Sequence, residues 1–161
     1  MIKTLKKNTK LCPEEFAEIV RLAPLVSVDL IVKDRHNRVL LGMRKNRPAK
    51  NFWFVPGGRV MKNERIADAI VRIAKDELGI KAAAANAKFL GVFEHLYEEN
   101  FACKKGFGTH YVVLAYEIRT SQTQLRGLDE QHSQYEWFDR RGAVNNKKVH
   151  PNTKAYFKPG R

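Results

Sequence analysis

Apolar residues recur at two different periods in the first third of the chain, and this predicts a short helix followed by two strands. In residues 13–22 the apolar side chains lie three or four positions apart, on one side of a helix. Residues 25–32 alternate in the manner of a strand, and residues 39–44 form a second apolar run. A turn is predicted at residues 34–37, so these strands are expected to pair as a hairpin.

Three further strands and a short terminal helix are predicted in the second half of the chain. The strands fall at residues 89–95, 109–118 and 134–138, and the helix at residues 153–157. The polar loop 98–108 is long for a hairpin, and such loops often carry function.

The stretch 52–80 joins a short strand, a glycine turn and a helix. Residues 53–55 form an apolar run bounded by Pro56 and two glycines, which favours a buried strand with a sharp exit. Asn63 is expected to cap a helix that ends at Gly79. The apolar face of this helix consists of Ile66, Ala69, Ile70, Ile73 and Ala74.

Glu77 places a carboxylate on this apolar face, near the C-terminal end of the helix. That end has negative dipole character, so an acidic side chain is poorly placed there unless a cation is bound. Asp76 stands beside it. Elements follow one another without a linker, a repeat or a low-complexity tract. We therefore expect a single α/β domain over residues 1–161, an α/β/α sandwich with a mixed sheet, in which residues 1–12 form a basic N-terminal extension.

The net positive charge of the chain bears on the kind of partner it binds. The chain has 30 basic and 17 acidic residues, for a net charge of +13 with neutral histidines. This excess favours an anionic partner, either a phosphorylated small molecule or nucleic acid, although a solvated basic surface explains it as well. RNA binding is disfavoured because aromatic residues are not interleaved with basic ones, and Trp53 and Phe54 are assigned to the core.

The cysteines and the N-terminus bear on the compartment. Cys12 and Cys103 are the only cysteines, and their spacing indicates neither a disulfide framework nor a zinc site. No apolar run approaches the ~18 residues of a membrane span, and the basic N-terminus lacks the apolar segment of a signal peptide. We expect a cytoplasmic protein with no membrane partner.

One acidic position is unusual, and two basic positions suggest a phosphate-binding site. Asp29 lies within a predicted strand, where acidic residues are uncommon; it either faces water at an edge or has a specific role. The loop 44–50 contains four basic residues, and planar guanidinium groups bind phosphate oxygens in pairs. Arg44 and Arg59, which flank the strand and glycine turn, are the predicted phosphate ligands.

The stretch 52–80 resembles the Nudix box. Six residues match that pattern in register: Gly58, Glu64, Arg72, Glu77, Gly79 and Ile80. Ile73 and Asp76 stand where the usual box has glutamates. Three carboxylates at i, i+3 and i+4 share one side of a helix, so these departures imply a reduced site with about one strongly held ion, anchored by Glu77.

The resemblance is closest to the GDP-mannose mannosyl hydrolase branch of the Nudix superfamily, in which the box has the same departures. It extends over residues 16–157 and includes Asn46-Arg47-Pro48-Ala49, Trp53-Phe54-Val55-Pro56-Gly57-Gly58-Arg59-Val60, Asp129-Glu130-Gln131-His132 and Ala155-Tyr156-Phe157. It implies that water attacks the anomeric carbon of GDP-mannose, or of GDP-glucose, with inversion, so that GDP leaves. It also implies a homodimer.

The same resemblance implies roles for individual residues. Magnesium would be held by Glu77, the side chain of Gln131 and the carbonyl of Gly57. His132 would be the general base, Asp29 would lie by the substrate, and the diphosphate would be contacted by Arg44, Arg59 and Tyr111.

Other interpretations stay open. A pyrophosphohydrolase acting on a nucleoside diphosphate derivative could use the remaining Asp76 and Glu77, and a non-catalytic binder of nucleotides or RNA could retain a decayed box. Without the resemblance, His132 would be read as a surface residue, and His95 and His110 are assigned structural roles.

Overall fold

A computed structural model of the chain describes residues 11–121 and 132–158. The elements, in chain order, are α1 (Pro13–Leu22), β1 (Leu25–Lys33), β2 (Val39–Arg44), β3 (Trp53–Phe54), β4 (Gly57–Arg59), α2 (Ile66–Leu78), the 3-10 turn η1 (Ala84–Asn86), β5 (Lys88–Tyr97), β6 (Thr109–Arg119), β7 (His132–Phe138), α3 (Arg140–Asn145) and α4 (Pro151–Ala155).

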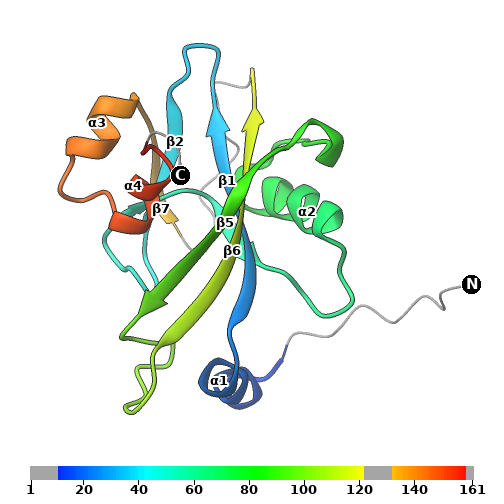
Figure 1. Ribbon diagram of the computed structural model, residues 1–161, viewed down its shortest axis with the longest axis vertical. Coiled ribbons are helices and arrows are strands. Elements are labelled where there is room, and N and C mark those ends of the chain that lie inside the picture. Colours follow the sequence, from blue (N-terminus) through cyan, green and yellow to red (C-terminus); the bar gives the residue numbers. More distant parts are fainter. Residues whose placement is uncertain (1–10, 122–131, 159–161) are drawn as a thin grey trace, which may run out of the picture.

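Within these residues, seven strands form one mixed sheet in which β1 is central (Figure 1). β1 runs parallel to β6 from Leu25 opposite Tyr111 to Lys33 opposite Arg119, and the other pairings are antiparallel. The path is β3-β2-β1-β6-β5, while β4 adds to β1 and β7 adds to β2.

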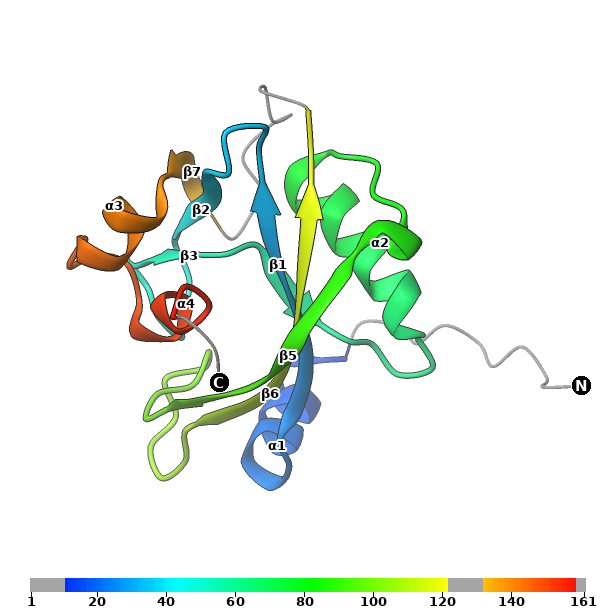
Figure 2. The ribbon, with the colours of Figure 1, turned by 45° about the horizontal axis from the view of Figure 1, so that its top comes forward.

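Helices cover both faces of the sheet, as the two views show (Figures 1 and 2). The apolar face of α2 packs on one side against β1 residues such as Val28 and Leu30. On the other side, Ile31 of β1 packs with Trp53, Phe54 and residues around α3 and α4. The predicted α/β/α sandwich with a mixed sheet is thereby confirmed, and so are the core positions of Trp53 and Phe54.

The predicted hairpin of β1 and β2 is correct only beside its turn. Lys33 pairs with Val39, and the turn is closed by the hydrogen bond from Asn37 N to Asp34 O, 3.1 Å long. Beyond this point the strands separate, because β1 takes β4 as its antiparallel neighbour and β2 takes β3 and β7. β1 is therefore an interior strand, and Asp29 does not face water at an edge.

One helix prediction is wrong, and one helix was not predicted. Asn63 does not cap α2: it lies in a turn with φ 64°, and Arg65 occupies the N-cap without a side-chain hydrogen bond. The chain makes a turn from Met61 to Glu64 before the helix begins. The helix α3 was not expected, although Asp139 caps it by accepting a hydrogen bond from Gly142 N.

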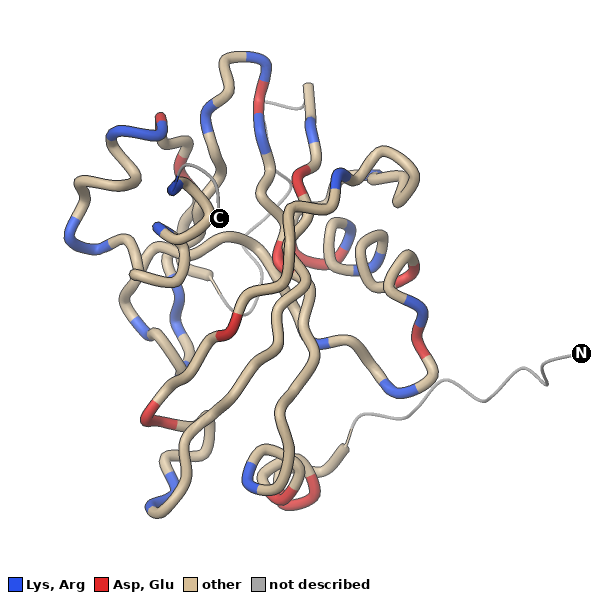
Figure 3. Tube along the Cα trace, viewed as in Figure 1, with Lys and Arg blue, Asp and Glu red and all other residues tan. Residues whose placement is uncertain are grey.

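Basic residues are spread over most of the described elements and do not gather on one face of the trace (Figure 3). Both cysteines are free and exposed. In the described parts of the chain, none of the helices has the length and apolar character needed to cross a membrane.

Candidate active site

The helix α2 brings one buried carboxylate to the glycine turn. Glu77 is 6% exposed, and its Oε2 accepts a hydrogen bond of 3.0 Å from Gly57 N. Asp76, the next residue back, is exposed, so the two neighbouring acids are not equivalent. The C-terminal turn of α2 thus directs a single buried carboxylate toward the turn.

Ile73 occupies a core position where the usual box has a glutamate. Its side chain is 1% exposed and packs with Val28 and Leu30. It also lies under Gly58, where a Cβ would come within 3.2 Å of Ile73 Cγ1. This position therefore contributes apolar packing and has no room for a charged ligand.

An ion pair fixes the segment between the glycine turn and the helix. Arg72 Nε lies 2.6 Å from Glu64 Oε1, and the Glu64 side chain is 4% exposed. Arg72 Nη2 also donates to the carbonyl of Arg59 at 2.9 Å, and Met61 N donates to Glu64 Oε2. The pKa of Arg72 is raised, chiefly by its hydrogen bonds to Glu64. These contacts position the backbone that carries Arg59.

Five of the predicted site residues meet at one cavity of about 210 Å³, here called the Asp29 cavity. It is lined by Ser27, Asp29, Arg44, Pro48, Phe54, Gly57, Gly58, Arg59, His95, Tyr97 and Tyr111. The predicted members that come together are Asp29, Arg44, Gly57, Arg59 and Tyr111. They come from β1, β2, β4 and β6, so the sheet assembles residues that are far apart in the sequence.

Asp29 is a buried carboxyl group in this cavity. Its Oδ2 accepts a 2.6 Å hydrogen bond from the Tyr156 hydroxyl. Burial raises the pKa of Asp29 to about 7, although the Tyr156 hydrogen bond and the charge of Arg44 oppose the shift. Gly57 is required beside it, because a Cβ there would lie 2.3 Å from Asp29 Oδ1.

Each of the two arginines lies near an aromatic ring. The Arg44 guanidinium lies 5.7 Å from the centre of the Phe54 ring, and its Nε donates to Pro48 O at 3.1 Å. The Arg59 guanidinium lies 4.2 Å from the centre of the Phe16 ring. Burial lowers the pKa of Arg59 and raises that of Tyr111, whose shift the two arginines oppose. A cavity with these cations suits an anionic ligand.

Sequence reasoning missed an aromatic and histidine cluster beside Asp29. The Tyr156 hydroxyl, bonded to Asp29, also lies 3.2 Å from His95 Nε2. Burial, and secondarily the nearby His150, lowers the pKa of His95 to about 4. His95 was assigned a structural role from the sequence. In the structure it lines the Asp29 cavity. Tyr156 carried a signal only as part of the quoted Ala155-Tyr156-Phe157 segment, since its partners lie more than sixty residues away.

His132 stands apart from this group. It is 1% exposed, begins β7 opposite Arg44, and its Nδ1 lies 2.9 Å from the Tyr135 hydroxyl. Its ring packs on Gly42, where a Cβ would be 2.5 Å from His132 Cδ2. It is not among the residues that line the Asp29 cavity. Its predicted role as general base stays a prediction, and Gln131 lies outside the described residues.

The predicted magnesium site can be compared with the oxygen atoms present. Within residues 11–121 and 132–158, no three His, Cys, Asp or Glu side chains gather as ligands for an ion. Glu77 offers one buried carboxylate against Gly57, and the Asp29 cavity adjoins that glycine. This donor set fits one magnesium ion that takes its remaining oxygen ligands from a diphosphate and water.

A mixed sheet between helices, with a buried glutamate facing a glycine turn, defines the class of Nudix-type hydrolases. The family model for the NUDIX domain matches residues 23–159, so the chain belongs to this family. The chain is 41% identical over 135 residues to the low-salt glycan biosynthesis protein Agl8 of Haloferax volcanii, and the match covers 83% of each protein.

Other relatives and solved structures agree with this assignment. An ADP-ribose pyrophosphatase of Methanocaldococcus jannaschii is 42% identical over 59 residues, 37% of this chain and 34% of that protein. The crystal structure of a MutT NUDIX hydrolase from Burkholderia pseudomallei superposes with a TM-score of 0.69 at 26% identity, over 84% of this chain and 96% of that chain. The NUDIX domain of Shewanella oneidensis NrtR, solved with ADP ribose, has the same fold with a TM-score of 0.64 at 15% identity, over 91% of this chain and 95% of that one.

Proposed function

We propose that this Nudix hydrolase cleaves the glycosyl C–O bond of GDP-mannose, or of GDP-glucose, and releases GDP and the free sugar with inversion. The observation that carries the proposal is the replacement of a ligand glutamate by the core residue Ile73, which leaves Glu77 as the buried carboxylate of the helix. In an ordinary Nudix site, water attacks a phosphorus atom of the substrate, and the carboxylates of that helix hold several ions. A site with about one ion is better matched to a reaction in which the diphosphate only has to leave.

The chemistry agrees with the charges around the Asp29 cavity. Breaking a sugar C–O bond passes through an oxocarbenium-like transition state and leaves negative charge on the diphosphate. Arg44 and Arg59 both line the Asp29 cavity, and their positive charge would stabilise the charge that develops on the diphosphate. Because the leaving group is already a stable anion, it needs no general acid, and one base that activates water is sufficient.

Magnesium, when bound, would supply further charge neutralisation on the leaving diphosphate. The chain's own contribution is Glu77 with its neighbour Gly57, together with Gln131 as the third expected ligand. Asp29 is expected to lie beside the sugar, since it is the acidic member of the cavity wall. His132 is the expected base and Tyr111 the expected further contact to the diphosphate.

Pyrophosphohydrolysis is the second candidate. It is favoured by the relatives described as ADP-ribose pyrophosphatase and 8-oxo-dGTP diphosphatase, the latter from Buchnera aphidicola and 34% identical over 87 residues, 50% of this chain and 68% of that protein. The placement of His132 away from the Asp29 cavity also favours it. The printed name of the Haloferax volcanii relative, which refers to glycan biosynthesis, suits an activated sugar.

Product analysis separates the two candidates. The purified protein is incubated with GDP-mannose and magnesium in oxygen-18 water, and the products are followed by proton NMR and mass spectrometry. We expect GDP and mannose, with the label on the sugar and the β anomer formed first. GMP and mannose 1-phosphate, with the label on a phosphate, would establish pyrophosphohydrolysis instead.

A further inference from the structure

The carboxyl group of Asp29 needs a contact of its own to orient it. Asp29 lies on β1, opposite Gly57 of β4 and Ala115 of β6, and it is 6% exposed. These pairings fix its backbone, but the terminal torsion of an aspartate is broad, so the sheet alone does not determine the direction of the carboxyl oxygens. The groups that touch these oxygens therefore decide which of them faces a ligand.

The two oxygens of Asp29 have different surroundings. Oδ2 accepts the 2.6 Å hydrogen bond from the Tyr156 hydroxyl. Oδ1 lies against Gly57, where a Cβ would come within 2.3 Å of it. Gly57 N donates to Glu77, so the Oδ1 side of the carboxyl group is the side of the expected magnesium ion and diphosphate. Tyr156 thus holds one oxygen and leaves the other directed toward the site.

His95 in turn orients the Tyr156 hydroxyl. The tyrosine oxygen lies 3.2 Å from His95 Nε2. The hydroxyl has a single proton, which it donates to Asp29, so its oxygen accepts from His95 Nε2–H. Burial lowers the pKa of His95 to about 4, so the ring is neutral at pH 7 and has one N–H to give. Hydrogen bonds therefore run from His95 through Tyr156 to Asp29, and such chains strengthen their members.

The ring of Tyr156 is fixed by packing and by the chain on either side of it. It meets the Phe93 ring edge-on, with 4.7 Å between the ring centroids and an interplanar angle of 79°. Tyr156 directly follows α4, and the next residue, Phe157, is 7% exposed and belongs to the core. The carbonyl of Phe157 accepts a hydrogen bond from Arg140 Nη2. The hydroxyl is therefore presented from a rigid support.

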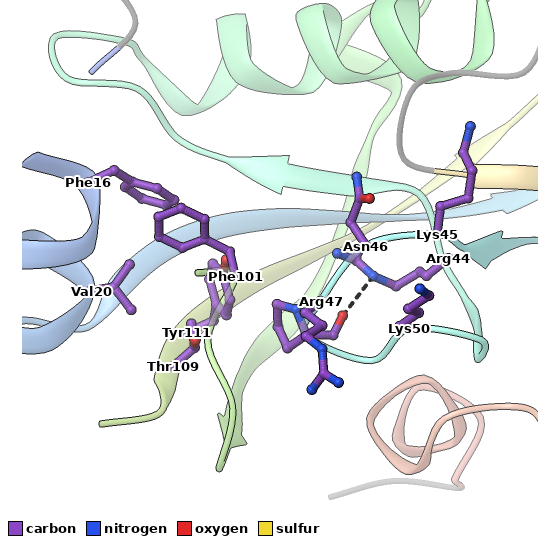
Figure 4. Close-up of a pocket in the computed structure, with 11 residues that line it drawn as sticks. Phe16, Val20, Arg44, Lys45, Asn46, Arg47, Lys50, Phe101, Thr109 and Tyr111 are labelled. Carbon is purple, nitrogen blue, oxygen red and sulfur yellow. Dashed lines mark hydrogen bonds between the residues drawn. The ribbon is translucent and has the colours of Figure 1, made fainter. Parts of the chain in front are cut away.

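The two predicted phosphate ligands are held by other contacts. Arg44 Nε donates to the carbonyl of Pro48 at 3.1 Å, within its own loop (Figure 4). The Arg59 guanidinium lies over the ring of Phe16. A change confined to the Tyr156 hydroxyl therefore alters the support of the cavity's carboxyl group and leaves the contacts of both arginines in place.

We propose that Tyr156 is a positioning residue of the active site: by holding Oδ2 of Asp29, it turns Oδ1 toward the sugar of the bound substrate. This inference rests on the proposed function, in which a sugar is expected beside Asp29. Tyr156 is not among the residues that line the Asp29 cavity, so it acts through Asp29 and not by touching the substrate. The role belongs to its hydroxyl group and not to its ring.

A double-mutant cycle of Tyr156→Phe and Asp29→Ala tests the assignment. Loss of a hydrogen bond to a charged group predicts that Tyr156→Phe lowers kcat/KM for GDP-mannose about tenfold. Its affinity for GDP, measured by calorimetry with magnesium, should stay within about twofold of the wild-type value, because GDP lacks the sugar. In the Asp29→Ala background, Tyr156→Phe should lower kcat/KM by less than about twofold, because no carboxyl group remains to be positioned.

Tyr116→Phe is the matched control. It removes the same hydroxyl from a partly buried tyrosine of β6 that does not line the cavity, and kcat/KM should be unchanged. Thermal unfolding establishes an assay temperature at which every variant is folded. A loss below about twofold in Tyr156→Phe alone would overturn the proposal. So would an equal loss in the Asp29→Ala background, or a loss of GDP affinity as large as the loss of kcat/KM.

These outcomes are independent of the bond that the enzyme breaks, because kcat/KM is measured for whichever products form. Non-additive losses in the cycle, together with GMP as the product, would support the positioning role and refute glycosyl cleavage. Glycosyl cleavage with additive losses from Tyr156→Phe and Asp29→Ala would do the reverse.

Discussion

Replacing Tyr156 with phenylalanine is expected to destabilise the fold by an amount that increases with pH. The substitution removes the hydroxyl that donates a 2.6 Å hydrogen bond to Asp29 Oδ2 and leaves the ring in place. Asp29 is buried, and its folded-state pKa is about 7, compared with a usual value of 3.8. The hydrogen bond therefore has a neutral acceptor at low pH and a charged one at high pH.

Proton linkage explains why the destabilisation by Tyr156→Phe increases with pH. Because the folded-state pKa of Asp29 is raised, the stability that this group contributes is fully present below about 3.8 and is lost as the pH rises through about 7. The Tyr156 hydrogen bond lowers that pKa, so removing it extends the loss to higher pH. His95, with a pKa lowered to about 4, acts in the opposite sense: its contribution is lost as the pH falls from 6.5 toward 4. Measurements at pH 6.5 and above therefore avoid the contribution of His95.

The magnitude can be estimated from the two protonation states. A hydrogen bond between neutral groups contributes about 1 kcal/mol and one to a charged group about 2 kcal/mol. For a protein of this size each kcal/mol corresponds to roughly 2–4 °C in Tm. Tyr156→Phe should therefore lower Tm by about 3 °C at pH 6.5 and by about 6 °C at pH 9, measured by thermal unfolding with EDTA present.

Two control variants make this test specific. Tyr116→Phe, which removes the hydroxyl of a partly buried tyrosine elsewhere on the sheet, should show a deficit that does not change with pH. In an Asp29→Asn background, Tyr156→Phe should also lose its pH dependence, because no carboxylate remains. Equal deficits at both pH values, or the same increase in the asparagine background, would refute the reasoning.

Three further predictions concern the active site. Glu77→Gln should abolish most activity and weaken magnesium binding in calorimetry. Asp76→Asn should have a smaller effect on both, because Asp76 is exposed. Normal magnesium affinity in Glu77→Gln would exclude Glu77 as the anchor of the ion. His132→Gln should lower turnover by about two to four orders of magnitude, with little change in GDP affinity, and a loss below about tenfold would remove His132 from the mechanism. Gly57→Ala should greatly reduce GDP affinity, measured by titration, because its Cβ would collide with Asp29 Oδ1 at 2.3 Å; wild-type affinity would show that the turn can shift without cost.

The elements of the fold were largely readable from the sequence, and their pairing was not. Apolar period and turn residues located α1 with its observed bounds and β1, β5 and β6 to within a few residues. The pairing of β1 with β4 could not be predicted from the sequence, because a three-residue strand of Gly57, Gly58 and Arg59 is too short to show an apolar periodicity. Asn63 was a reasonable cap by residue type, but the pairing of Glu64 with Arg72 determines how the chain enters the helix.

The candidate site was predictable where a motif marked its residues. Arg44, Arg59 and Tyr111 were expected from basic composition and resemblance, and the cavity brings them together. The hydrogen-bonded chain from His95 through Tyr156 to Asp29 could not be predicted, since its members are separated by 66, 61 and 127 positions and no pattern connects them.

The packing of Ile73 makes the departure from the usual Nudix box difficult to reverse. A glutamate restored at this position would place a carboxylate among Val28, Leu30 and the backbone of Gly58, where the present side chain is 1% exposed. An unpaired buried charge costs several kcal/mol, which is a large part of the stability of an ordinary domain. A return to the multi-carboxylate box by a single codon replacement would therefore endanger folding before it changed catalysis. Laboratory evolution toward such a site would need prior changes in the neighbouring core, so the history of the core constrains which chemistry the chain can acquire next.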